Sequence, residues 1–275
     1  MNPNAPYTVL IGPGDLRKAY GAGKFTFGNP DAGEVVCLVG SCRIAPILNY
    51  FRAYNSLHGD RFELICLNPV EMWEGDGTSL ADGTRKCLAD FRFGKVDFLI
   101  CEHMVNCGVL NTLDSPAFCQ DHTRENLFKS LGCAPGAILR LPNWHTLHIY
   151  DAETAGFDPS YAAMDPGDRK EFLRRQVAEH KERYLGYCRD CSFPEMEQWT
   201  LDNWTKVRMG WTNSHATREL SWKLFELIAR DMGLEIIPQL AAHPFCTRDM
   251  FVGRGHHTEL TPLDYEVNGW EFRNP

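Results

Sequence analysis

Residues 35–46 have the sequence VVCLVGSCRIAP, in which an apolar run leads through a turn of small residues into a helix-like segment. The run is nearly continuous rather than alternating, which is typical of a strand covered on both faces of a parallel sheet. Similar runs occupy residues 62–67, 96–101, 137–141 and 234–237. Helix-like segments lie between or after them, at residues 43–57, 124–131 and 214–232. This alternation of strand and helix predicts the α/β class.

Residues 151–209 interrupt the alternation with a largely polar segment. Asp165 and Pro166 stand where a helix N-cap and first helical residue are expected, and Leu173, Val177 and Tyr184 recur on one side of the predicted helix. Its basic and acidic residues are interleaved, which favours a solvated face over an anion-binding surface. We therefore expect one α/β domain over residues 1–275, with a mainly helical insertion at about 151–209. Residues 1–31 and about 241–275 are expected to be irregular.

The composition excludes several classes of protein. Among 275 residues, 44% are hydrophobic and 23% charged, as in ordinary globular proteins. Lys and Arg number 28 against 36 Asp and Glu, and the resulting net charge of −8 disfavours binding to nucleic acid. No apolar run is long enough to span a membrane, and the first residues lack a secretion pattern. A cytoplasmic protein without membrane insertion is expected, and its oligomeric state is left open.

The cysteines are scattered singly, which favours reduced core residues over a disulfide framework. Cys188 and Cys191 have the spacing of half a zinc site, but no second pair of ligands follows at a suitable distance. We therefore expect no bound metal. The role of Cys188 and Cys191 is left open between structural thiols, redox chemistry and zinc.

Cys42 is the first candidate for catalysis. It follows the turn after the first long strand, at the carboxyl end of the predicted sheet, where open α/β folds place their active sites. A helix N-terminus and the neighbouring Arg43 would both stabilise its thiolate, which is the nucleophilic form. The alternative is a small buried cysteine at a helix start.

A nucleophile requires a base, and His215 is the preferred candidate among ten histidines. It lies just before the last long predicted helix, from where the chain can return to the strand ends. His103, directly after the third predicted strand, is the rival base. The alternative for His215 is a helix-capping histidine without chemistry.

The segments GSCR at residues 40–43 and NSHAT at residues 213–217 together resemble the WcbI family of polysaccharide-biosynthesis proteins. Members of that family typically show a Gly-Asn-Cys-Gln turn and a late Asn-His-Pro segment, and the family is itself similar to the SGNH hydrolases. Residues 141–151 also fall where the family has an aromatic and His-containing strand end. Ser41, Arg43 and Ala216 depart from the pattern, and Thr212 stands where the hydrolases have an Asp. A Cys-His dyad is therefore implied rather than a full triad.

The resemblance implies an SGNH-like parallel sheet and acyl transfer, with coenzyme A as donor and a sugar hydroxyl of a capsular or surface polysaccharide as acceptor. In the alignment Cys42 takes the nucleophile position and His215 the base position. Oxyanion donors would be the backbone amides of Cys42 and Arg43 together with Asn106, for which a turn-forming role is the alternative. A coenzyme A site in an acidic protein also requires local cations. The residues expected to hold this cosubstrate are Ser41, Arg43, Lys206, Arg208 and Arg218.

Two other functions stay open at the level of the sequence. An esterase or deacetylase would use the same dyad on water. A non-catalytic nucleotide-binding or glycan-binding protein would leave Cys42 inert. Within the acyltransferase hypothesis, Cys42 either carries the acyl group or positions the donor while His215 activates the acceptor directly.

Overall fold

The computed structural model describes residues 25–27, 31–39, 42–67, 96–102, 138–142, 144, 161–211, 215–250 and 260–272. The chain forms two compact units. The first comprises Met1–Leu141 and Leu224–Arg248, and the second Pro142–Lys223 and Asp249–Pro275. The expected single domain with an insertion at about 151–209 stays a prediction.

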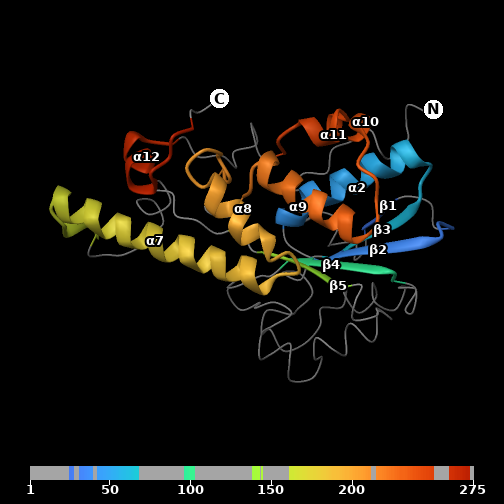
Figure 1. Ribbon diagram of the computed structural model, residues 1–275, viewed down its shortest axis with the longest axis horizontal. Coiled ribbons are helices and arrows are strands. Elements are labelled where there is room, and N and C mark those ends of the chain that lie inside the picture. The colour runs from blue at the N-terminus through green and yellow to red at the C-terminus, as the bar shows by residue number, and fades with distance from the viewer. Residues whose placement is uncertain are drawn as a thin grey trace, which may run out of the picture. The chain divides into compact units, whose positions relative to one another are not determined.

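The first unit is built on a five-stranded sheet with the order β1-β3-β2-β4-β5 (Figure 1). Its strands are β1 (Phe25–Phe27), β2 (Glu34–Val39), β3 (Phe62–Leu67), β4 (Phe98–Glu102) and β5 (Ile138–Leu141). The last four run parallel to their neighbours, and β1 pairs antiparallel with β3. The predicted α/β fold with a central parallel sheet is confirmed. The expectation that residues 1–31 are irregular is wrong for β1, whose three residues are too few to show a periodic pattern.

The central strands are buried, which explains their continuous apolar sequence. Val36, Cys37 and Leu38 of β2 are fully buried although successive side chains point to opposite faces of a sheet. β2 pairs with β3 along one edge and with β4 along the other, and the burial of consecutive residues shows that both of its faces lie in the core.

Helices of the first unit pack against one another around aromatic side chains. A 3₁₀ turn, η2 (Cys42–Ile44), continues into α2 (Ala45–His58), which ends at Gly59 with φ 75°. The amide of Asn55 donates to the Phe62 carbonyl at 2.7 Å and its oxygen accepts from the Phe62 N–H at 3.0 Å, tying the end of α2 to the start of β3. Phe225 of α9 (Arg218–Asp231) packs edge-on against Phe51, with ring centroids 5.3 Å apart. The predicted amphipathic helix thus supplies core contacts.

Three expectations for the C-terminal part need correction. Residues 234–237 form no strand, because they are the extended lead from Gly233 (φ 66°) to α10 (Pro238–Ala241). The helix expected at 214–232 begins at Arg218, since the preceding residues are held in a bridged loop. The C-terminal segment also contains α11 (Pro244–Thr247) and α12 (Pro262–Asn268), the latter begun by a Thr261–Asp264 capping box. The helix expected at 124–131 lies outside the described residues.

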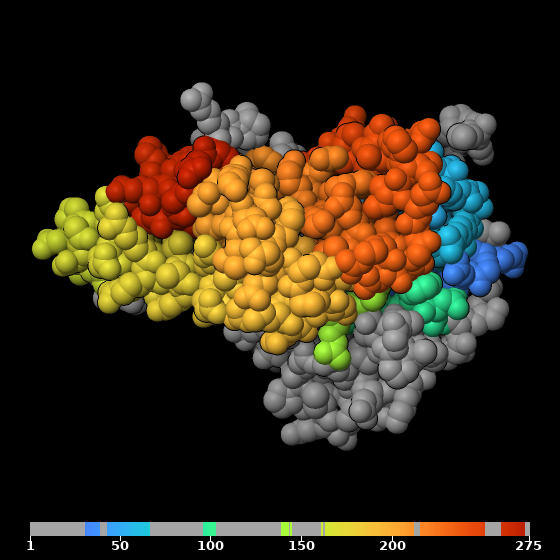
Figure 2. Space-filling model, in the orientation of Figure 1, coloured from blue at the N-terminus to red at the C-terminus, as the bar shows by residue number. Residues whose placement is uncertain are grey.

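The second unit is mainly helical. Its elements are η5 (Tyr161–Ala163), α7 (Pro166–Asp190), α8 (Glu195–Asn203) and α12. Figure 2 shows α7 and α8 side by side in yellow and amber, with α12 in red against α7. Leu173 and Val177 of α7 form a core cluster with Tyr161 and Val267. This is the face predicted from the spacing of apolar residues.

The outer face of α7 carries ion pairs with carboxylates. Lys170 and Arg174 both contact Glu266 of α12. Arg189 pairs with Glu182 at 2.6 Å and also contacts Glu197 of α8. These contacts favour the solvated, ion-paired face over an anion-binding surface.

Of the helices that the structure describes, none combines the length and apolar character needed to span a membrane.

Candidate functional site

The carboxyl ends of β2 and β4 form the place in the sheet where a ligand site is expected. After β2 the chain turns to β3 on one side, whereas β4 lies on the other side of β2. Open α/β sheets bind ligands beyond the carboxyl ends of their strands where the order reverses in this way. Cys42 and Arg43 follow β2 within η2, and Glu102 is the last residue of β4.

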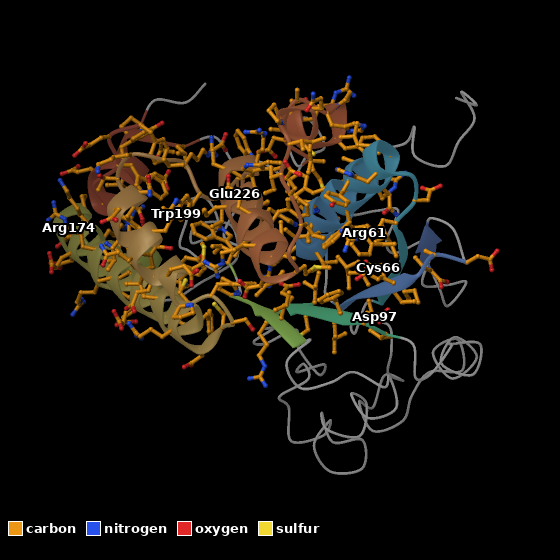
Figure 3. The ribbon with its side chains drawn as sticks, turned by 45° about the vertical axis from the view of Figure 1, so that its right-hand side comes forward. Arg61, Cys66, Asp97, Arg174, Trp199 and Glu226 are labelled. Carbon is orange, nitrogen blue, oxygen red and sulfur yellow. The ribbon has the colours of Figure 1, made fainter. Side chains whose placement is uncertain are left out.

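An ion pair joins these two strand ends. Nη1 of Arg43 donates to Oε1 of Glu102 at 2.9 Å, and the side chains are 17% and 3% exposed, respectively. At the opposite end of the sheet, Nε of Arg61 lies 2.7 Å from Oε2 of Glu34, but those side chains are 39% and 34% exposed. Figure 3 labels Arg61, which lies just before β3. Both ion pairs join the ends of neighbouring strands, but the Arg43–Glu102 pair is much more buried than the Arg61–Glu34 pair.

Glu102 is a site residue that the sequence argument did not select. Its position directly at the end of an apolar run was the pattern that could have identified it. Its carboxylate offsets much of the positive charge of Arg43. Arg43 therefore contributes less to the acidity of a neighbouring thiol than the sequence alone suggested.

Cys42 is the first residue of a helical run that continues through η2 into α2, because Ile44 at the junction has helical angles. This is the backbone position predicted for it. Ser41, Asn106 and the rival base His103 lie outside the described residues. Their expected roles stay predictions.

We expect Cys42 to react faster with iodoacetamide than the buried cysteines, because helix starts favour thiolates. Labelling from about pH 5 to 9, followed by peptide mapping, measures this order of reactivity. Cys188 is a matched control, since burial raises its pKa to about 12. Modification of Cys42 only after unfolding would identify it as a packing residue and remove it as a nucleophile.

His215 lies in a bridged loop of the second unit. The Trp211 N–H donates to the His215 carbonyl at 2.7 Å, and Gly210 and Ala216 form an antiparallel bridge. The first amide of α9, at Arg218, donates to Oδ2 of Asp249 at 2.7 Å. Asp249 therefore supports the start of α9, and His215, three residues earlier, is half-buried at the base of the loop.

The expected phosphate-binding cations flank this loop in different ways. Lys206 is exposed. Arg208 is half-buried, and burial lowers the pKa of its guanidinium despite nearby Asp249 and Asp264. Arg218 lies over the Trp222 ring at 5.9 Å. All three belong to the same unit as His215.

A Ser–His contact in the first unit is structural rather than catalytic. Nε2 of His243 lies 3.3 Å from Oγ of Ser56, while its Nδ1 accepts a hydrogen bond from the Phe245 N–H at 3.1 Å. Burial lowers the pKa of His243 and so favours the neutral ring. With Nδ1 accepting, the ring proton is on Nε2 and is donated to Ser56, which itself donates to the Ala53 carbonyl. His243 therefore cannot remove a proton from Ser56 in this arrangement.

The Cys188 and Cys191 pair has the properties of structural thiols. Burial is the largest influence on both and raises their pKa values to about 12 and about 11. The Cys191 thiol donates to the Cys188 carbonyl and accepts from the Phe193 N–H, closing the C-terminus of α7. Metal ligation and thiol exchange both require the thiolate, which this environment disfavours. Within the described ranges, no group of three or more His, Cys, Asp or Glu is arranged to hold a metal ion.

Comparisons with known proteins give one informative result. No family model matches the sequence, and no curated protein matches it. Among solved structures, the fold is similar to that of WcbI, described as a novel polysaccharide biosynthesis enzyme, in its native form without a disulfide bond between coenzyme A and one of its cysteines. The similarity has a TM-score of 0.53 and 14% sequence identity, and covers 88% of this chain and 81% of WcbI. The resemblance to WcbI inferred from short motifs is therefore confirmed at the level of the fold.

Proposed function

We propose that this protein is a coenzyme A-dependent acyltransferase that acts on a sugar hydroxyl in the biosynthesis of a capsular or surface polysaccharide. The observation that carries the proposal is the position of Cys42, on the helical turn directly after the central strand β2, in a fold similar to that of WcbI. WcbI is a polysaccharide biosynthesis enzyme described in relation to coenzyme A and a cysteine. The cysteines that the structure describes are free and mostly buried, which supports a cytoplasmic location.

In the covalent route, His215 first takes the proton of the Cys42 thiol. The thiolate then attacks the thioester carbonyl, and coenzyme A receives that proton from His215 and leaves as its thiol. His215 then takes the proton of the sugar hydroxyl, whose oxygen attacks the acyl-cysteine and releases the Cys42 thiolate. In the direct route, His215 takes the proton of the hydroxyl, whose oxygen attacks the thioester itself while Cys42 positions the donor. The bond to sulfur breaks, and coenzyme A receives the proton from His215 and leaves as its thiol. The backbone amides of Cys42 and Arg43, with Asn106, would stabilise the oxyanion in both routes. Ser41, Arg43, Lys206 and Arg218 would hold the donor, and no metal is required.

Ligand-dependent stabilisation followed by a transfer assay tests this function. A ligand at about 100 times its dissociation constant stabilises a protein by about 2.7 kcal/mol, so coenzyme A and acetyl-coenzyme A should raise the melting temperature. Release of coenzyme A from its thioester should then depend on an added sugar acceptor. Release that is equally fast without acceptor would instead identify a hydrolase. Absence of any shift with coenzyme A, its thioesters or adenine nucleotides would contradict the proposal.

A further inference from the structure

Arg208 makes contacts that join the two ends of the His215 loop. Its Nε–H donates to the Gly210 carbonyl at 3.0 Å, and its guanidinium carbon lies 4.2 Å from the centre of the Trp211 ring. Its own carbonyl accepts a hydrogen bond from the Thr217 hydroxyl at 2.7 Å. Arg208 therefore contacts the incoming arm of the loop through its side chain and the outgoing arm through its backbone.

The rest of the loop base is equally constrained. The Thr217 N–H donates to the Met209 carbonyl at 2.8 Å, beside the bridge between Gly210 and Ala216. Gly210 also lies against the indole of Trp144, where an added Cβ would be 2.5 Å from Nε1. Every residue from 208 to 211 thus has a contact that fixes its place. These contacts define a clamp formed by Arg208, Gly210, Trp211 and Thr217.

A phosphate ligand and a clamp residue make different demands on an arginine. A phosphate ligand presents its guanidinium N–H groups toward the bound anion. Arg208 directs its Nε–H to a carbonyl of its own loop and stacks its planar group on a tryptophan of the same loop, as a residue that holds the loop would do. Its half-buried position follows from these contacts, whereas the nearby Lys206 is exposed.

We infer that Arg208 is a positioning residue, which holds residues 210–211 against residues 215–217 so that His215 is presented in one fixed place to the acyl acceptor. The role of His215 in this inference rests on the proposed function, whereas the existence of the clamp does not depend on it. It assigns Arg208 an action through the loop, in place of the phosphate contact suggested by its charge. Catalysis is sensitive to such placement, because a displacement of about 1 Å can lower a rate by about 10²-fold.

Arg208→Ala and Thr217→Val test the inference together. Thr217→Val removes the hydroxyl that binds the Arg208 carbonyl without changing charge or size appreciably. Both variants should lower kcat, Arg208→Ala by about 10- to 100-fold, while the KM for the acyl donor changes by less than about threefold. Arg208→Lys should recover little, since an ammonium group lacks the planar fork of arginine.

Hydrogen exchange of the backbone amides gives a readout that needs no turnover. The amides of Trp211 and Thr217 donate within the loop base and should exchange slowly in the native protein. In Arg208→Ala their exchange should accelerate at least about tenfold, with α8 unaffected. Lys181→Ala is the matched control, because Lys181 also lies over a tryptophan of this unit, Trp204, at 4.8 Å. Within the part of the chain that the structure describes, Lys181 makes no hydrogen bond, ion pair or ring contact with the loop. It should change neither kcat nor the exchange of the loop.

Two results would overturn the inference. Unchanged exchange at Trp211 and Thr217 in both variants would show that the clamp does not hold the loop, whether or not the protein is an acyltransferase. A raised dissociation constant for coenzyme A in Arg208→Ala, with little effect on dephospho-coenzyme A and a normal kcat, would make Arg208 a ligand of the 3′-phosphate. Accelerated exchange in a protein that shows no acyl transfer would keep the clamp and reject the proposed function. If Arg208→Ala does not fold, the kinetic and hydrogen-exchange measurements are made on Thr217→Val alone.

Discussion

Replacement of His215 by alanine is expected to lower kcat by about 10²–10⁴-fold, while coenzyme A binding stays near its native value. A general base acts on the proton that moves in the transition state, so its loss reduces kcat much more than ground-state affinity. The bridged loop favours this outcome, because its own backbone bonds fix the loop without the imidazole. Alanine should therefore remove the base without releasing the loop. Single-turnover kinetics and calorimetric titration of coenzyme A separate the two effects.

The control for this substitution is His58→Ala, which removes an exposed histidine stacked on Tyr54 at the end of α2. That variant should keep its turnover. Near-native turnover of folded His215→Ala would assign the base to another residue, and His103 would be tested next. A parallel rise of the coenzyme A dissociation constant would instead place His215 in donor binding.

Replacement of Glu102 by alanine is expected to lower the free energy of unfolding by about 3 kcal/mol. Breaking a buried ion pair by removing one partner costs about 3–5 kcal/mol, because the remaining charge loses its compensation. The lower end of this range applies here, because the Arg43 side chain is 17% exposed and water can partly solvate its charge. Urea denaturation, with the slope compared between variants, measures the loss.

The exposed pair of Arg61 and Glu34 provides a control on the same sheet. Glu34→Ala should cost less than about 1 kcal/mol, because solvent screens an ion pair whose members are a third or more exposed. A double replacement, Arg43→Met with Glu102→Ala, should recover part of the loss by removing the uncompensated cation. Equal effects of the Glu102 and Glu34 substitutions would show that burial of the first pair has no energetic consequence.

Much of the sheet could be predicted from local patterns. The strands β2, β3, β4 and β5 were each located within two residues, because a fully buried strand needs an unbroken apolar run. The start of α7 followed from Asp165 and Pro166, and its buried face from the helical spacing of Leu173 and Val177. The strand expected at 234–237 was wrong, since an apolar run also suits a chain that leads into a short helix.

The candidate site was predictable only in its parts. The turn after β2 identified Cys42 by its place between strand and helix, and the same logic located His215 before α9. Glu102 was missed because its partner Arg43 is 59 residues away in the chain, and no local pattern links them. The contacts of Arg208 were missed for a related reason: its charge suggested a ligand, whereas its guanidinium binds a carbonyl and stacks on an indole of its own loop.

The sequence by itself determined the secondary structure of the central sheet, the α/β class and the helical turn that begins at Cys42. These properties depend on side-chain volume and polarity at short, regular intervals, which the sequence displays directly. The tertiary structure decided the order of the strands, which makes β2 and β4 neighbours, and so brought Glu102 to Arg43. It also decided that Arg208 stacks on Trp211 and binds the loop of His215. Contacts of this kind form where the surfaces of different segments pack together and exclude water. They depend on the packing of the whole unit rather than on any single segment.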